Sequence, residues 1–528
     1  MTFPPALRPA LVVLLAALVL TGAARRRGAE YDEAYSLFVT AGMPRPAWPD
    51  GVFQARLEHR IAAGHAGLVR IARELRATDV HPPLYFWALG AWRRVVGPGL
   101  FAARLLSVLA ALVALALVGA IARTAAIPSV PAMAFTLGCY GFTYTGAIAR
   151  NFALAEALAL AGVWLALGPG RIRAAAAGLA LGAASFTNYL AAFLGAAVLI
   201  GTLCRGRWQR AGWVLGGMLP WLPGGLWFLL AQRNSRAGQF PPFHLGAALL
   251  RLLRDAAGAS FGGLPLYVPA GWMRLSMGLG VAALATGVAG LILARWRRIG
   301  AAAARPVLGA GALAPAAGLL VLGLVSDSTP IELRYLAFAT PFVALLLAGA
   351  LARLPRPAGW AAGGVVALVQ ALAVWGLLAR PETMQPARAA AAAAARLAGR
   401  GGLVLLPRGN DGVGVVGPFL AEAPGWLRVR LVGPGSDPRA LAAGSDRVIL
   451  ALIGVDRASR ATLPRLRAAF AGPRWRVVGT GFDTRALARA TPPDPGSSVR
   501  PTPSSVAYRA VPSCRTAAPG AACSDRPR

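Results

Sequence analysis

The stretch "LVVLLAALVLTGAARRRGAEYDEAYSLF" (residues 11–38) sets a long apolar run directly before three arginines and three carboxylates. The apolar segment around it, residues 8–24, is long enough to predict a membrane-spanning helix. Its small-residue exit also resembles a signal peptide, but three arginines directly after such a site would hinder export, so an uncleaved helix is favoured. Glu30, Asp32 and Glu33 would then lie just beyond the membrane.

The composition of the whole chain indicates a helical membrane protein. The 528 residues are 56% hydrophobic, and the mean hydropathy is +0.57. Soluble globular proteins rarely reach such values. The formal net charge is +34, and the sequence contains arginine but no lysine. Because the arginines are spread over loops between apolar segments, they favour membrane lipids and phosphates as partners, and nucleic acid is not expected.

Hydropathy predicts an all-α polytopic membrane protein with about 11 transmembrane helices. The pieces between residues 82 and 168 are short and could include half-helices. The predicted segments are 8–24, 82–98, 101–123, 128–147, 150–168, 174–204, 211–232, 273–294, 306–326, 334–353 and 359–380.

The placement of arginines predicts the orientation, because cytoplasmic loops carry an excess of positive charge. The dense clusters that define the cytoplasmic side are 204–210, 295–298 and 353–357. The first loop, 25–81, and everything after residue 380 then lie outside. Two features disagree with this prediction: the arginines at 25–27, and Arg171 with Arg173, fall outside as well.

Three regions are predicted: a transmembrane domain over 1–384, a small α/β domain outside the membrane over 385–511, and a disordered tail over 512–528. In the second region, four strands alternate with helices near 387–399 and 458–471. The predicted strands are 402–407, 426–433, 446–454 and 475–482. In the tail, Cys514 and Cys523 could pair if the tail is extracytoplasmic.

The glycines of "GVGVVG" (412–417) have the GxGxxG spacing of a dinucleotide site. Such a site needs a long helix directly after the glycines, and "PFLAEAPG" breaks within about eight residues. A plain glycine-rich loop is therefore the prediction.

Asp32 and Glu33 are the first candidates for chemistry. On a helix they point about 100° apart, so one can serve as a base while the other is structural. A carboxylate at the membrane surface, walled by aromatic side chains, suits a general base that deprotonates an incoming hydroxyl. The alternative is a helix start, where acidic side chains favour the positive end of the dipole.

Two further stretches contribute candidates. In "DVHPPLYFW" (79–87), the proline pair leaves His81 just outside the membrane near Asp32, where it could bind a phosphate, a sugar or a metal or could be structural. In "STPIELRYLAFATPF" (328–342), Arg334 suits a lipid-linked phosphate at head-group depth, or pairs with Glu332. By the segment count, Arg150 falls near the inner side and is not expected in the site.

The order of these pieces resembles the bacterial dolichyl-phosphate-mannose–protein-mannosyltransferase-like family, a branch of the GT-C glycosyltransferases. The resemblance covers residues 8–380 and rests on the Asp-Glu pair, "HPPLYFWALGAWRRVV", "PWLP" (220–223) and "LRYLAFATPF". One departure is Phe152, where many relatives carry the tyrosine of an Arg-x-Tyr element. The positions that match the family's motifs are Asp32 and Glu33 (catalytic acids), Arg334 and Tyr335 (carrier phosphate), His81, and Glu332 beside them.

This resemblance implies an enzyme of the bacterial inner membrane that takes a sugar from a polyprenyl-phosphate carrier on the outer, periplasmic face. The acceptor would be an envelope glycan, a lipid or a protein. No nucleotide is required at this step and no cofactor is certain, while a divalent metal is optional. Two other readings remain open: a transporter or flippase of lipid-linked sugars, and a membrane anchor that presents the C-terminal domain.

Overall fold

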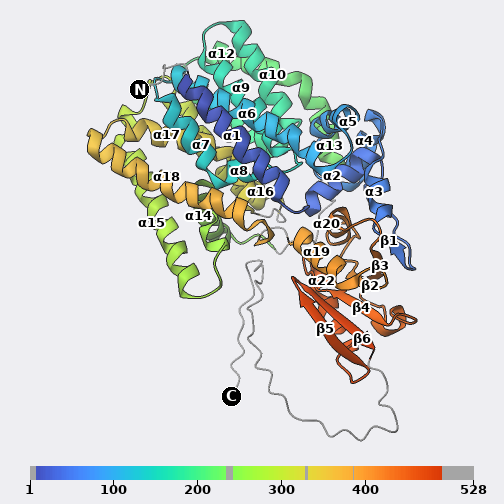
Figure 1. Cartoon of the computed structure of the whole chain (residues 1–528). Helices are drawn as coiled ribbons and strands as arrows, with labels where there is room; N and C mark the ends of the chain where they lie inside the picture. The colour runs from blue at the N-terminus through green and yellow to red at the C-terminus, as the bar shows by residue number, and fades with distance from the viewer. Residues whose placement is uncertain (1–6, 233–241, 327–330, 384–385, 490–528) are drawn as a thin grey trace, which may run out of the picture.

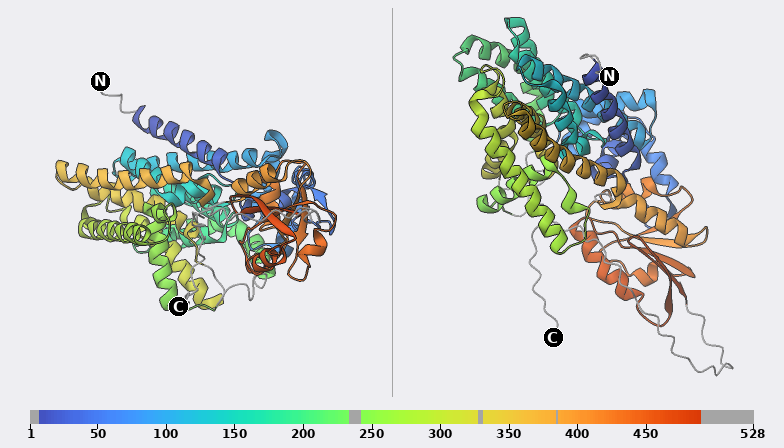
Figure 2. Two further views of the ribbon diagram at one scale, coloured as in Figure 1. Left: turned by 60° about the horizontal axis from the view of Figure 1, so that its bottom comes forward. Right: turned by 60° about the vertical axis from the view of Figure 1, so that its left-hand side comes forward.

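The computed structural model describes residues 7–232, 242–326, 331–383 and 386–489. A bundle of long helices carries, at one end, several short helices from the first loop and a mixed sheet from the C-terminal region (Figure 1). Two further views show the sheet at the same end of the bundle (Figure 2). The predicted class, a helical membrane domain with a small α/β region, is therefore confirmed. The predicted tail, with Cys514 and Cys523, lies outside the described residues.

Among the described residues, seven helices are long and apolar enough to cross a membrane, so the chain is a multi-pass membrane protein. They are α1 (Leu7–Arg26), α6 (Leu100–Thr124), α12 and α13 (together Trp208–Gln232), α15 (Trp272–Arg295), α16 (Arg305–Ser326), η5 with α17 (Leu333–Leu351) and α18 (Arg356–Ala379). Shorter helices complete the bundle: α7 (Ser129–Gly138), α8 (Tyr140–Gly146), α9 (Phe152–Leu167), α10 (Arg171–Ser185), α11 (Ala192–Leu203) and α14 (Leu245–Phe261).

The predicted second segment, 82–98, does not cross the bundle. It forms α5 (Leu84–Val96), which is 13 residues long, and a membrane helix needs about 20. Near its C-terminal end, Arg93 donates to the carbonyl of Leu37 at 3.1 Å and Arg94 to that of Ala66 at 2.9 Å. Both ends of α5 thus stay beside the first loop, at the end of the bundle that carries the sheet.

The predicted segment 174–204 forms two helices, because the chain breaks between α10 and α11 at residues 186–191. Arg210 donates to the carbonyl of Gly168, so the loop before α10 lies beside the 204–210 cluster. Arg171 and Arg173 therefore belong to the arginine-rich end, and one disagreement with the charge rule disappears. The structure therefore divides residues 82–204 differently from the prediction, and seven of the described helices meet the length and composition criterion for a membrane span.

The C-terminal region folds as the predicted alternation of helices and strands. It contains α19 (Ala387–Ala398), β2 (Leu403–Pro407), α20 (Val416–Glu422), β3 (Arg428–Val432), α21 (Pro438–Leu441), β4 (Arg447–Ala451), α22 (Arg457–Ala469), β5 (Trp475–Gly481) and β6 (Thr484–Arg489). The sheet order is β1-β3-β2-β4-β6-β5. Strand β2 pairs in parallel with β3 and β4, whereas β6 is antiparallel to β4 and β5.

The first loop and the C-terminal region share this sheet and one core. The short helices of the first loop are α2 (Tyr31–Ala41), α3 (Arg56–Ala62) and α4 (Leu68–Thr78). Strand β1 (Phe53–Gln54) pairs antiparallel with β3, with Phe53 opposite Val429. The Trp48 ring stacks on Phe53, and its indole nitrogen donates to the carbonyl of Gly412 at 2.6 Å. The glycine-rich stretch 412–417, which ends in the first turn of α20, thus packs against the first loop.

Candidate active site

Helix α2 begins where the three carboxylates gather, and two of them account for that start. Glu30 is the N-cap residue, and it forms a capping box with Glu33: each side chain accepts from the other residue's backbone N–H. Capping boxes satisfy two of the backbone donors that a helix start leaves unpaired. The helix ends at Gly42, whose φ of 80° is in the left-handed region that favours glycine. Of the three carboxylates, Asp32 has no part in the cap.

Glu33 is fully buried, and its carboxylate is engaged on every side. Arg104 of α6 donates from Nε to Oε1 at 2.7 Å and from Nη2 to Oε2 at 2.6 Å. The backbone N–H of Ala149 donates to Oε1 at 2.8 Å, and that of Glu30 to Oε2 at 3.1 Å. These bonds connect the first loop to two passes of the bundle and leave Glu33 facing away from any cavity.

Asp32 points in another direction and lies between two guanidinium groups. Arg334, at the start of η5, bonds to its Oδ2. Arg150, in the turn before α9, lies 3.4 Å from its Oδ1. Residues far apart in the sequence thus meet on one carboxylate, which is 6% exposed. Two cations beside a carboxylate favour its ionised form.

Arg334 is shared between two acidic side chains. Besides Asp32, it pairs through Nε with Glu332 at 2.6 Å. Its guanidinium carbon lies 5.6 Å from the centre of the Tyr335 ring, and that ring stacks on Phe152 at 6.2 Å. The proposed carrier-binding residues are therefore contiguous with Asp32, and Phe152 supports the tyrosine beside Arg334.

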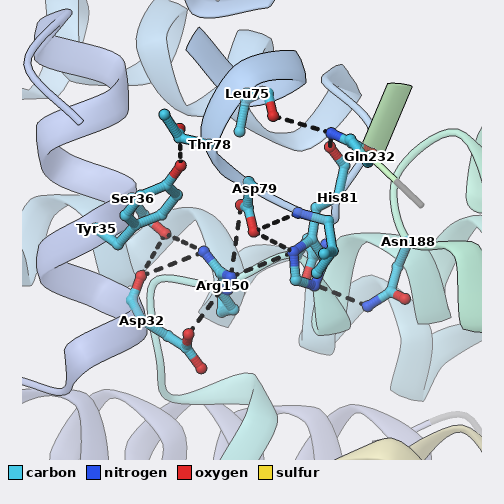
Figure 3. Close-up of polar contacts among 12 residues, drawn as sticks. Asp32, Tyr35, Ser36, Leu75, Thr78, Asp79, His81, Arg150, Asn188 and Gln232 are labelled. Atoms are coloured by element: carbon cyan, nitrogen blue, oxygen red, sulfur yellow. Dashed lines mark hydrogen bonds and ion pairs between the residues drawn. The ribbon is translucent and has the colours of Figure 1, made fainter. Parts of the chain in front are cut away.

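Arg150 links Asp32 to a second group of polar residues, drawn in Figure 3. Its Nη2 lies 3.3 Å from Nδ1 of His81 and 3.7 Å from Asp79, and its Nη1 donates to the Ser36 hydroxyl at 3.2 Å. His81 Nδ1 is also 3.0 Å from Asp79. His81 thus reaches Asp32 through Arg150 and not directly.

The electrostatics of this group favour ionised side chains. Burial alone would raise the pKa of Asp79, but His81 and Arg150 outweigh it and hold that pKa well below its ordinary value. The arrangement Asp32–Arg150–Asp79–His81 therefore alternates negative and positive charge when His81 is protonated.

Arg150 and Asp79 are the polar residues that sequence reasoning missed. The prediction that Arg150 lies away from the site is wrong, because Arg150 contacts Asp32 and Asp79 of the first loop. The segment count places it at the other end because it treats the short helix α5 as a full pass. The signal was present: an arginine inside an apolar region needs a partner, and the "DVHPP" stretch contains a carboxylate two residues before His81.

A cavity of about 480 Å³ opens beside Asp32 and Arg334. One wall comes from the first loop and the bundle, with Tyr31, Asp32, Tyr144 and Arg334. The rest of the lining comes from the C-terminal region. Of the pair Asp32 and Glu33, only Asp32 lines this cavity. The arrangement can hold an anion at Arg334 and present a carboxylate oxygen to a group bound in the cavity.

No cluster of three or more His, Cys, Asp or Glu side chains suited to a metal ion occurs in the described parts of the chain. His81 and Asp79 supply two such side chains, and Arg150 lies between them and Asp32.

Comparison with known proteins establishes the fold. No protein-family model and no curated protein sequence matches the chain. The crystal structure of ArnT from Cupriavidus metallidurans bound to undecaprenyl phosphate matches with a TM-score of 0.51 at 15% identity. The apo structure of the same protein matches with a TM-score of 0.52 at 14% identity. In each case 91% of this chain and 97% of the other are covered. The predicted GT-C fold is confirmed.

Proposed function

We propose that this chain, which has the fold of ArnT, is a glycosyltransferase that moves a sugar from a polyprenyl-phosphate carrier to an acceptor hydroxyl. The observation that carries the proposal is the contact between Asp32 and Arg334 at the edge of the cavity. One group is a base, the other is a fixed cation, and both lie at the end of the bundle where a lipid-borne phosphate would emerge. The ArnT neighbour bound to undecaprenyl phosphate supports this choice of carrier.

The ion pair between Asp32 and Arg334 is the state of the site before the carrier binds. A phosphate is a stronger partner for a guanidinium than a single carboxylate oxygen, so the carrier would replace Asp32 on Arg334. Arg150 and the α2 backbone would keep Asp32 in place while that happens. Carrier binding would thereby free one carboxylate oxygen of Asp32 for the acceptor.

The transfer step follows from these roles. The acceptor's hydroxyl oxygen forms a bond to the anomeric carbon of the sugar while its proton passes to Asp32. The bond between that carbon and the phosphate oxygen breaks, and its electron pair leaves on the phosphate held by Arg334. Because the leaving group is already a good one, no acid is needed, and positioning with charge stabilisation supplies most of the rate.

The direction of insertion follows from charge. The loops at the arginine-rich end would face the cytoplasm, so the site and the C-terminal region would face the periplasm of a bacterial inner membrane. The acceptor is then a molecule of the cell envelope: a glycan, a lipid or a protein. Glu33 takes a structural part in this proposal, since Arg104 and two backbone groups occupy it.

The test compares Asp32→Asn with Asp50→Asn, an exposed aspartate of the same loop. Each variant is expressed in a strain that lacks the gene, and its envelope glycans are measured by mass spectrometry against wild type. Loss of a general base should reduce transfer by about a hundredfold or more, while Asp50→Asn should restore it fully. An active Asp32→Asn protein of normal abundance contradicts the proposal.

A radioactive label on the sugar distinguishes the proposed transferase from the rival function, a flippase. The full chain is placed in vesicles with a radiolabelled carrier-linked sugar and envelope lipid. A transferase moves the label from the carrier to an acceptor. A flippase moves it across the bilayer still attached to the carrier.

A further inference from the structure

The cavity beside Asp32 has a second wall that no motif of the bundle accounts for. It comes from the C-terminal region: Gly414, Val415, Ile453, Gly454, Val455 and Arg460. Because these residues line the same cavity as Asp32 and Arg334, the C-terminal region is part of the candidate site. The question is which substrate it contacts.

The position of this wall in the sheet indicates a ligand site. Gly414 and Val415 are in the connection after β2, and Ile453 to Val455 are in the connection after β4. Strands β2 and β4 are parallel neighbours, and the chain leaves β2 first toward β3 on its other side. In open α/β sheets, ligands bind outside the carboxyl ends of strands at the point where the order reverses. Here that point opens onto Asp32.

The two connections are held in place by hydrogen bonds between them and to α2. The N–H of Asn410 donates to Asp456 at 2.9 Å, and the Asn410 side chain accepts from the N–H of Ala458 at 3.1 Å. The hydroxyl of Tyr31, the residue before Asp32, donates to Asp411 at 3.0 Å. The crevice is therefore fixed relative to the proposed base.

Arg460 adds a guanidinium to a cavity whose lining also includes the carboxylates of Asp32, Glu332 and Asp483. Its Nη2 donates to the carbonyl of Val455 at 3.0 Å, and its Nε is 3.4 Å from that of Gly454. The other terminal nitrogen, Nη1, bonds to none of the residues that the structure describes. The guanidinium is thus oriented by the loop it stands on, with donors left for an anion.

We propose that the crevice between the β2 and β4 connections is the acceptor site, and that Arg460 binds an anionic group of a saccharide acceptor. The proposal rests on the glycosyltransferase function above. The carrier's tail must remain in lipid, so its phosphate approaches Arg334 from the bundle. An attacking hydroxyl comes from the face opposite the leaving group when the configuration inverts. The residues that the C-terminal region adds to the cavity are therefore the candidates for holding that acceptor, since Arg334 of the bundle is assigned to the carrier phosphate.

The experiment uses the full chain and separates the acceptor from the carrier. Variants Arg460→Ala and Arg460→Lys are compared with Arg457→Ala, an exposed arginine of the same helix that does not line the cavity. Transfer is measured as envelope glycan in the gene-deleted strain. Carrier binding is measured as the affinity of purified protein for undecaprenyl phosphate. Loss of a hydrogen bond to a charged group predicts a ten- to hundredfold fall in transfer (about 1.5–3 kcal/mol) for Arg460→Ala, with the affinity for undecaprenyl phosphate unchanged.

A second variant tests the crevice without touching a charge. Val455→Trp should fill the cavity and block transfer, whereas Val477→Trp, on the exposed β5 strand away from the cavity, should not. Normal sugar transfer by both Arg460→Ala and Val455→Trp overturns the acceptor assignment. It is also overturned if either variant weakens the affinity for undecaprenyl phosphate as much as it lowers the rate of transfer. If wild type neither binds undecaprenyl phosphate nor alters the envelope, the proposed function itself has failed.

Discussion

Replacing Glu33 with glutamine tests how the two neighbouring carboxylates of α2 divide their roles. Glu33 accepts four hydrogen bonds, two from Arg104 and one each from the backbone of Ala149 and Glu30. A glutamine amide can accept only at its oxygen, and its NH₂ group would confront donors on the other side. The substitution also leaves Arg104, which is 1% exposed, without its counter-charge.

The expected cost follows from these contacts. Removing one partner of a buried ion pair costs about 3–5 kcal/mol. Arg104 keeps three backbone acceptors, the carbonyls of Ala24, Arg27 and Gly28, so the lower limit of about 3 kcal/mol applies. At about 2 °C per kcal/mol, the melting temperature should fall by about 6 °C. Asp32→Asn should change it little, because Arg334 keeps Glu332 and Arg150 keeps Asp79.

The assay is thermal unfolding of the purified full chain in detergent, followed by tryptophan fluorescence, alongside transfer activity per folded molecule. A double variant, Glu33→Gln with Arg104→Gln, should be more stable than the sum of its single changes predicts, since it removes both buried charges. If Glu33→Gln melts like wild type and yet loses transfer as fully as Asp32→Asn does, Glu33 acts in the chemistry and the structural role is refuted.

Three further outcomes are expected. Arg334→Ala should weaken the affinity for undecaprenyl phosphate by about ten- to a hundredfold, and an unchanged affinity in a binding titration would count against carrier binding there. Burial raises the pKa of Glu58 to about 8, above its ordinary value, so the stability that the protonated Glu58 carboxyl contributes is present below about pH 4.5 and is lost as the pH rises through 8. Glu58→Gln should therefore melt at a higher temperature than wild type at pH 9 and at the same temperature at pH 4. A difference in melting temperature that does not depend on pH would contradict this. Trp48→Ala removes the stack on Phe53 and the bond to Gly412, and should expose the 408–415 loop to limited proteolysis; an equally resistant variant would show that this contact is dispensable.

The sequence predicts the fold class well, because long apolar runs have few alternatives to spanning a membrane. It fails where helices are short. Segment 82–98 is as apolar as a membrane-spanning helix. Its position beside the first loop depends on hydrogen bonds from Arg93 and Arg94 to backbone carbonyls of that loop. No local pattern reveals such distant partners.

The candidate site shows the same limit. The resemblance singles out Asp32 and Arg334, which the structure brings into contact. The segment count, however, assigns Arg150 to the wrong end of the bundle, because it treats the short helix α5 as a full pass. The C-terminal strands follow from local alternation, whereas β1 has only two residues, and its pairing depends on residue 429.

That pairing has a consequence for how the protein is made. Strand β1 has to wait for β3, which the ribosome adds about 370 residues later; at about 5–20 residues per second, the delay is on the order of 20–70 s. During this interval the loop that bears Asp32, which lies across the bilayer in the proposed orientation, lacks the sheet that completes it. Chains released early by a nonsense codon would keep their membrane helices yet never assemble this loop, so the folding of the C-terminal region becomes the step at which the nascent polypeptide matures.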